Sequence, residues 1–241
     1  KYQPMGEDCL TLNVVSPRWD GPTPDGEPLP VMFFIHGGGY ILGSSATPLY
    51  DGAALARRGC VYVSVNYRLG PLGCLDLSSL STPDITIESN LFLRDLVAAL
   101  RWVKENIGGF GGDPENVTIF GESAGAHAVA TLLAVPDSKG LFAQAISESP
   151  ASGMVSSPEV AAEFAGRFVD VLGIDRGAAA PALLSADPAD MVRAMNTVMT
   201  KSLDSMMGAA AVGPTHSDDY LPLDPFDAMR KGTAHKVPLI V

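Results

Sequence analysis

One short stretch, residues 117–129, limits the possible fold of this chain more than any other. It reads Val-Thr-Ile-Phe-Gly-Glu-Ser-Ala-Gly-Ala-His-Ala-Val. The β-branched and aromatic start is typical of a buried strand, and the small apolar residues from Ala124 onward are typical of a packed helix. Gly121 and Gly125 bracket Ser123, as a tight strand-to-helix turn requires. The pattern predicts an α/β fold in which one serine hydroxyl stands at the top of a sheet.

A Gly-x-Ser-x-Gly pentapeptide alone is a weak signal, because it often arises by chance. Here a strand pattern precedes it, a helix pattern follows it, and a second motif lies upstream. We therefore predict that Ser123 is a nucleophile. We expect the neighbouring Glu122 to be a buried, hydrogen-bonded structural carboxylate.

The upstream motif is a glycine-rich loop. Residues 31–35 are apolar on both faces, as in an interior strand of a parallel sheet, and residues 36–40 read His-Gly-Gly-Gly-Tyr. Consecutive glycines cost backbone entropy, and close approach of bare N–H groups to a ligand is one reason for them. A dinucleotide site is the alternative, but the loop misses the Gly-x-Gly-x-x-Gly spacing because Leu42 holds the third position.

The rest of the chain predicts a parallel sheet with crossover helices. We expect further strands near residues 10–15, 60–65, 142–147 and 237–241, and a crossover helix over residues 90–107. Strand, helix, strand in this order places ligands at the carboxyl ends of the strands, where the glycine loop and Ser123 both lie.

The second half of the chain is rich in alanine and methionine, with helical stretches broken by Gly and Pro. We predict a core over residues 1–155, a helical cap or insertion over residues 156–231, and a further core strand beginning in residues 232–241. Methionines at helical spacing in the cap could line an apolar pocket, but more often fill a core; these are Met195, Met199, Met206 and Met207.

Composition narrows the classes of partner. The 241 residues carry a formal net charge of -11, which argues against nucleic acid or an anionic membrane as a partner because both would repel the chain. No apolar run is long enough to span a bilayer. The three cysteines have no metal-ligand spacing, and their odd number leaves the compartment undecided. We expect no metal and no cofactor.

Several short signatures occur in order over residues 7–125: Glu-Asp-Cys-Leu-Thr-Leu-Asn (7–13), His-Gly-Gly-Gly (36–39), Asn-Tyr-Arg-Leu-Gly (66–70), Leu-Arg-Trp-Val (100–103), Phe-Gly-Gly-Asp-Pro (110–114) and Gly-Glu-Ser-Ala-Gly (121–125). Together and in this order they resemble the type-B carboxylesterase family, which includes bacterial para-nitrobenzyl esterases, animal carboxylesterases and cholinesterases.

The resemblance implies an α/β-hydrolase fold and the hydrolysis of a small-molecule carboxylic ester. It implies that Ser123 attacks the ester carbonyl and that the backbone N–H groups of Gly38, Gly39 and Ala124 hold the oxyanion. Such donors lower the barrier by roughly 3 to 4 kcal/mol each, and an acyl-enzyme forms and is then hydrolysed.

The departures from the family concern the general base. The resemblance places the catalytic acid just after the strand near residue 241 and the histidine far beyond it, so we expect neither in this chain, and we expect further sequence at both ends. The 241 residues alone should then lack efficient turnover. An internal triad of Ser123, Asp218 or Asp219, and His235 has the right chain order, but His235 precedes an expected strand instead of following one.

Two competing functions remain open at this point. A non-catalytic binding module resembling the neuroligins would share the fold, although those relatives usually lose the serine that is intact here. An amidase would share the same nucleophile. The sequence leaves oligomeric state and acyl or alcohol preference undecided.

Overall fold

The computed structural model describes residues 5–17, 26–202 and 211–241. Its strands are β1 (Leu12–Val15), β2 (Leu29–Ile35), β3 (Val61–Val65), β4 (Gly112–Glu122), β5 (Gln144–Glu148) and β6 (Leu239–Ile240). Its helices are α1 (Ala53–Ala56), α2 (Leu91–Asn106), α3 (Ala124–Leu132), α4 (Pro158–Leu172), α5 (Ala179–Leu183), α6 (Pro188–Ser202) and α7 (Pro225–Lys231), and its 3-10 helices are η1 (Pro48–Tyr50), η2 (Gly70–Leu72), η3 (Ser78–Leu80), η4 (Ile107–Phe110), η5 (Pro136–Ser138) and η6 (Arg176–Ala178).

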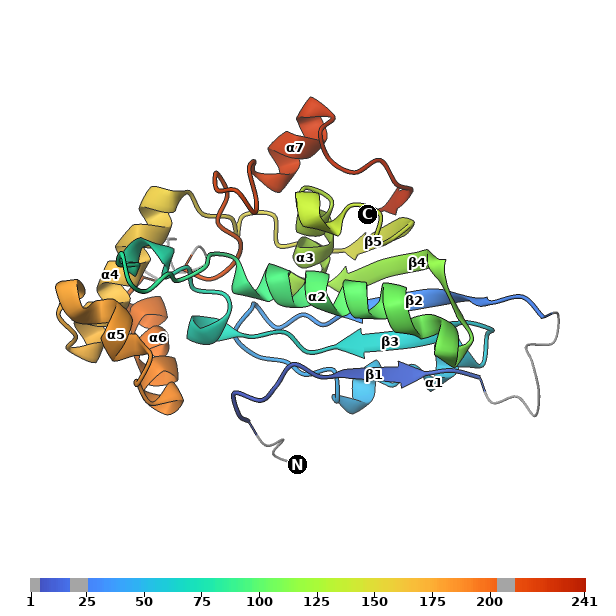
Figure 1. Ribbon diagram of the computed structural model, residues 1–241, viewed down its shortest axis with the longest axis horizontal. Helices are drawn as coiled ribbons and strands as arrows, with labels where there is room; N and C mark the ends of the chain where they lie inside the picture. The colour runs from blue at the N-terminus through green and yellow to red at the C-terminus, as the bar shows by residue number, and fades with distance from the viewer. Residues whose placement is uncertain (1–4, 18–25, 203–210) are drawn as a thin grey trace.

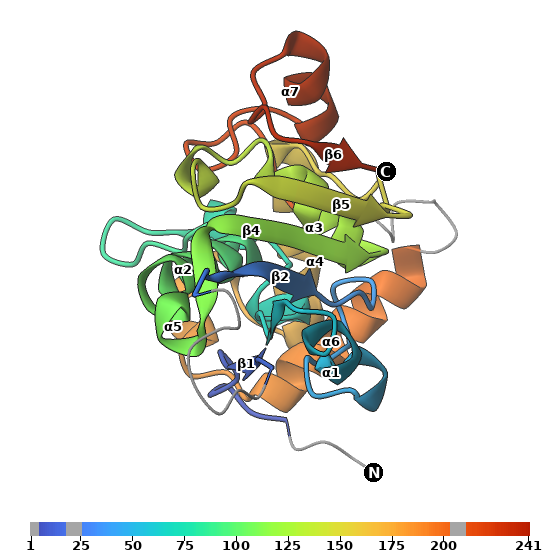
Figure 2. The same ribbon diagram turned by 90° about the vertical axis from the view of Figure 1, so that its right-hand side faces the viewer.

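The strands form one six-stranded sheet in the order β1-β3-β2-β4-β5-β6. Only β1 runs antiparallel to its neighbour; the pairs from β3 through β6 are parallel. Figure 1 shows α2 lying along this sheet, and Figure 2 shows β4, β5 and β6 side by side with α7 above them. The predicted mostly parallel sheet with flanking helices is confirmed.

The strands next to the site are buried because they carry almost no polar side chains. Every residue of β3 is buried, and β2 is fully buried over its last three residues. Helix α2 covers the sheet with one apolar face, whose buried residues include Phe92, Leu96 and Leu100. The helix begins after Asn90, as the pattern over residues 90–107 predicts. This packing gives β2 and β4 a rigid base at their carboxyl ends.

The structure differs from the sequence prediction at the start of β4. The β-branched and aromatic run predicts a strand that begins at Val117, but strand pairing already begins at Gly112, opposite Leu29. The register then shifts, because Val31 pairs with Val117. The bulge accommodates the extra residues, and Asp113 stabilises it by accepting a hydrogen bond from Glu115 N at 2.8 Å.

Helices α4, α5 and α6 lie together at one end of the sheet (Figure 1). Met195 on α6 is fully buried in the hydrophobic core and Met199 packs against it, so both fill the core; Met206 and Met207 lie outside the described residues. The division of the chain at residues 155 and 231 stays a prediction. In the part of the chain that the structure describes, no helix combines the length and apolar character needed to cross a membrane.

Candidate active site

Ser123 lies at the junction of β4 and α3 in a strained backbone conformation. Its φ of 56° and ψ of -119° are rarely adopted by a residue with a side chain. Its amide donates a hydrogen bond to Glu148 O at 3.0 Å, at the end of the neighbouring β5. Ser123 is half-buried. The sharp turn predicted from the sequence is therefore present.

The glycines on either side of Ser123 are needed because the end of β2 lies very close. A Cβ on Gly121 would lie 2.5 Å from Ile35 O, and a Cβ on Gly125 would lie 2.1 Å from the same oxygen. Real Cβ atoms do not approach backbone oxygens so closely. The tight turn thus depends on a tertiary contact between β2 and the start of α3.

The glycine loop that follows β2 lies directly against Ser123. A Cβ built on Gly37 would lie 3.3 Å from Ser123 Cβ and 2.7 Å from Glu122 O. Gly38 and Gly39 have φ values of 117° and 61°. Gly38 O accepts hydrogen bonds from the amides of Ile41 and Leu42, both at 3.1 Å, which closes the loop. The structure therefore brings the predicted loop and the predicted serine together.

Residues 66–70 hold the glycine loop from the side of β3. Tyr67 donates its hydroxyl hydrogen to His36 O at 2.7 Å, and Gly70 N donates to Tyr40 O at 2.7 Å. The His36 and Tyr67 rings stack at 4.6 Å. These contacts fix both ends of the loop.

A partly buried ion pair anchors residues 66–70 in turn. Arg68 donates from Nη2 to Asp95 Oδ1 at 2.6 Å and from Nε to Asp95 Oδ2 at 2.9 Å. The Asp95 side chain on α2 is only 5% exposed. The hydrogen bonds that Arg68 donates to Asp95 raise the pKa of Arg68. Two parallel N–H···O bonds give the pair a defined orientation.

Two buried histidines lie beside the site. His36 Nδ1 donates to Gly37 O at 2.8 Å, so this histidine shapes the glycine loop. His127 lies on α3, and its Nδ1 is hydrogen-bonded to the Tyr40 hydroxyl at 3.0 Å. Burial lowers the pKa of both rings, and that of His127 falls to about 4. The Nε2 atoms of both are buried without a hydrogen-bond partner among the described residues.

The structure does not bring the internal triad candidates to Ser123. His235 Nε2 donates to Val135 O at 2.7 Å, beyond the C-terminal end of α3, while Ser123 lies at its N-terminal end. The nine residues of α3 span about 14 Å. His216 Nδ1 is hydrogen-bonded to Ser217 Oγ at 2.7 Å, so both histidines have hydrogen-bond partners other than Ser123.

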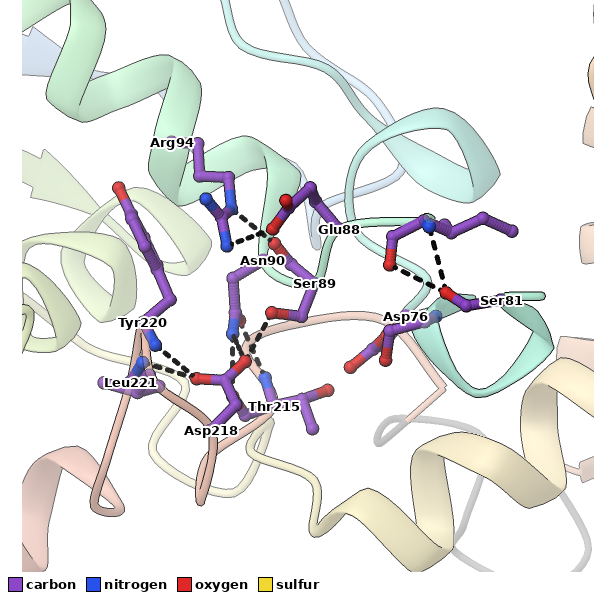
Figure 3. A network of polar contacts seen from close by, with 12 residues as sticks. Asp76, Ser81, Glu88, Ser89, Asn90, Arg94, Thr215, Asp218, Tyr220 and Leu221 are labelled. Carbon is purple, nitrogen blue, oxygen red and sulfur yellow. Dashed lines mark hydrogen bonds and ion pairs between the residues drawn. The ribbon is translucent and has the colours of Figure 1, made fainter. Parts of the chain in front are cut away.

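The Asp218 carboxylate belongs to a separate polar network, shown in Figure 3. It accepts hydrogen bonds from Ser89 Oγ, from Asn90 Nδ2 at 3.0 Å, and from the amides of Tyr220 and Leu221. Asp219 is exposed. These residues border an open pocket of about 260 Å³ whose lining does not include Ser123 or the glycine loop.

Asn90 closes this network by pairing with the backbone of Thr215. Its Nδ2 donates to Thr215 O at 2.8 Å, and its Oδ1 accepts from Thr215 N at 2.9 Å. Arg94 donates to Ser89 O at 2.9 Å and lies 4.2 Å over the Tyr220 ring. The network therefore ties the start of α2 to residues 215–221, with Asp218 as its central acceptor.

Two features of the site differ from, or add to, the sequence prediction. Glu122 is exposed, so the expectation of a buried structural carboxylate is wrong; the end of β4 leaves its side chain at the surface. The Tyr40–His127 pair was not predicted, because the two residues lie 87 positions apart.

Among the described residues, no group of three or more His, Cys, Asp or Glu side chains could hold a metal ion.

A serine on a sharp strand-to-helix turn, at the carboxyl edge of a mostly parallel sheet, defines the class: this is an α/β-hydrolase fold. The carboxylesterase family model matches residues 1–241, and the chain belongs to the carboxylesterase family.

Individual relatives agree with the family match. Para-nitrobenzyl esterase of Bacillus subtilis (strain 168) is 43% identical over 98% of this chain and 46% of the relative. Fumonisin B1 esterase of Sphingopyxis macrogoltabida is 39% identical over 98% of this chain and 42% of the relative. A solved PNB esterase structure, 41% identical, superposes with a TM-score of 0.88 over 99% of this chain and 47% of that one. The chain thus spans about half the length of the relatives it matches.

Proposed function

We propose that this chain carries the nucleophile and the oxyanion hole of a serine carboxylesterase that acts on small-molecule carboxylic esters. The observation that carries the proposal is the approach of the glycine loop to Ser123, with 3.3 Å between a Cβ on Gly37 and Ser123 Cβ. An ester carbonyl attacked by Ser123 Oγ would have its oxygen next to the loop amides.

The oxyanion donors would come from two segments. Gly38 and Gly39 lie in the loop, and Ala124 is the first residue of α3, where a helix leaves its amides without partners inside the helix. The positive end of the helix dipole adds to the stabilisation of a negative oxygen at this point. Preorganised donors of this kind lower the barrier because they need no reorientation when charge develops.

The serine would need a general base to accept its proton. None of the four histidine rings is hydrogen-bonded to Ser123 in the described residues, because their partners are Gly37, Tyr40, Ser217 and Val135. We propose that neither the general base nor the acid that orients it is Asp218, Asp219 or His235, and that other residues supply both groups. No metal or cofactor takes part in the proposed reaction.

Steady-state hydrolysis of a p-nitrophenyl ester by the full-length protein tests this function. We expect turnover with Ser123 present and a fall of at least about 10⁴-fold in kcat for Ser123→Ala, since nucleophile removal has effects of that order or larger. Ser152→Ala, in the loop after β5, is a control of the same chemistry. Equal rates for the Ser123→Ala variant and the unsubstituted protein would contradict the proposal, and no turnover in either would favour a binding module.

A further inference from the structure

The proposed oxyanion hole combines amides from two segments that are far apart in the chain. We propose that Tyr40 and His127 form a positioning pair that sets the spacing between the glycine loop and α3. This inference rests on the proposed function. Catalytic groups must be held within a fraction of an ångström of their working positions, so a contact that sets this spacing acts on the rate.

The pair joins the residue that follows the loop donors to the first turn of α3. Tyr40 directly follows Gly39 and has a left-handed φ of 63°. His127 lies one helical turn after Ser123, and its amide donates to Ser123 O at 2.9 Å. The 3.0 Å hydrogen bond between the Tyr40 hydroxyl and His127 Nδ1 therefore joins the residue after the loop donors to the turn that carries the nucleophile.

Neither ring has room to turn. Both side chains are fully buried at 0% exposure. The Tyr40 ring packs against Phe92 with 4.8 Å between centroids, and the His127 ring lies parallel to Phe226 with 6.3 Å between centroids. A hydrogen bond held in this way is rigid, and its loss leaves a buried polar group unpaired.

The ionisation of His127 favours an intact pair at neutral pH. Burial lowers its pKa to about 4, and the nearby Asp224 at the start of α7 opposes this shift. Burial also raises the pKa of Tyr40 well above its usual value. Both groups are therefore neutral at pH 7, as this hydrogen bond requires.

Within the described residues, no second side-chain hydrogen bond joins the glycine loop to α3. The other contacts that hold the loop, from Tyr67 to His36 O and from Gly70 to Tyr40 O, reach it from the segment after β3. In the part of the chain that the structure describes, the Tyr40–His127 bond is the side-chain hydrogen bond between residues 36–43 and α3. Removing it frees the loop to shift relative to Ala124.

Variant kinetics on the full-length protein test the pair with a p-nitrophenyl ester. We expect Tyr40→Phe and His127→Leu each to lower kcat by about 10- to 100-fold with KM changed less than about threefold, because the misplacement affects the transition state. The kcat of the double variant should be no lower than that of the less active single variant, since all three variants lose the same contact. His127→Asn keeps an amide at the place of Nδ1 and should recover most of kcat.

Tyr62→Phe is the matched control. Tyr62 is also buried, and its hydroxyl donates to Tyr50 O at 2.9 Å. Among the described residues, this hydroxyl has no hydrogen bond to α3 or to the glycine loop. We expect its kcat to be unchanged. If His127→Leu does not fold, Tyr40→Phe, which removes one oxygen atom, gives the decisive result.

The outcomes separate this inference from the proposed function. With normal turnover by the unsubstituted protein, a kcat of Tyr40→Phe within twofold of it would overturn the inference about the pair alone. Losses of kcat that multiply in the double variant would do the same. If the unsubstituted protein shows no turnover and forms no adduct on Ser123 with a fluorophosphonate, the proposed function is overturned, and the inference with it.

Discussion

Two polar regions of the molecule differ in how their hydrogen-bonding groups are used. Around Asp218, one carboxylate accepts four donors, and the Asn90 amide pairs on both sides with Thr215. Around Ser123, the buried Nε2 atoms of His36 and His127 have no hydrogen-bond partner among the described residues.

The difference separates a structural polar cluster from a reactive one. A network in which every member is paired stabilises the fold and leaves no group free for a substrate. Unpaired groups next to a strained backbone cost stability, and they persist where a ligand or reacting group can use them. We infer that the Asp218 region connects segments of the fold and the Ser123 region is reserved for chemistry.

Apart from Ser123→Ala, Gly38→Ala should have the largest effect. A Cβ at this position would lie 2.0 Å from Leu42 O, and the φ of 117° disfavours any side chain, so the loop must move. We expect kcat for p-nitrophenyl ester hydrolysis to fall about 10²- to 10³-fold, as for the loss of one oxyanion donor. Gly108→Ala, at a glycine with open space around it, is the control and should keep its rate. Full activity of Gly38→Ala would contradict the distinction between a reactive Ser123 region and a structural Asp218 region.

The pH dependence of stability should show the next largest effect, through His127. Its pKa is about 4 when folded and about 6.5 when free, so the unfolded chain binds the proton first as pH falls. The contribution of the neutral His127 ring to the free energy of unfolding is fully present above pH 6.5. It is lost as the pH falls from 6.5 to 4, and the loss amounts to about 3 kcal/mol.

Urea unfolding at pH 7 and pH 4 measures this contribution. The unsubstituted protein should lose about 3 kcal/mol more than His127→Asn over this range, because the variant lacks the titrating ring. Tyr40 and Asp224 face the ring in both proteins, and other carboxylates contribute equally. An identical pH dependence in the two proteins would show that His127 is not held neutral by burial.

Asp218→Ala should have the smallest effect, and on stability alone. It would leave the four donors of the network without their acceptor, and we expect the free energy of unfolding to fall by about 2 kcal/mol. The kcat of the folded variant should stay unchanged. Asp219→Ala removes the same charge from an exposed neighbour and should change stability by less than about 0.5 kcal/mol. A loss of kcat in folded Asp218→Ala would contradict this comparison, because it would give the Asp218 carboxylate a catalytic role.

Local features of the fold and site were predictable from sequence. The run over residues 117–129 predicted the strand, the turn at Ser123 and the helix, because each depends on residue types within a few positions. The apolar run before the glycine loop predicted an interior strand, and β2 is the partner of both β3 and β4. Parallel strand order then placed loop and serine at one edge.

Contacts between distant residues were not predictable in the same way. Asn90 and Asp218 are 128 positions apart, and Tyr40 and His127 are 87 apart, so neither pairing has a local pattern. Asp218 was considered as a triad member from chain order, while the structure gives its carboxylate four other partners. The close approach of Ile35 O to Gly121 and Gly125 likewise depends on how β2 meets α3.

The most direct test of the account is to locate the reactive residue chemically. The full-length protein is treated with a fluorophosphonate, digested, and its peptides are analysed by mass spectrometry. We predict a single phosphonyl adduct on Ser123, absent from Ser123→Ala and retained in Asp218→Ala. An unmodified Ser123 in the folded protein, or an adduct that persists in Ser123→Ala, would contradict the assignment of this turn as the reactive centre.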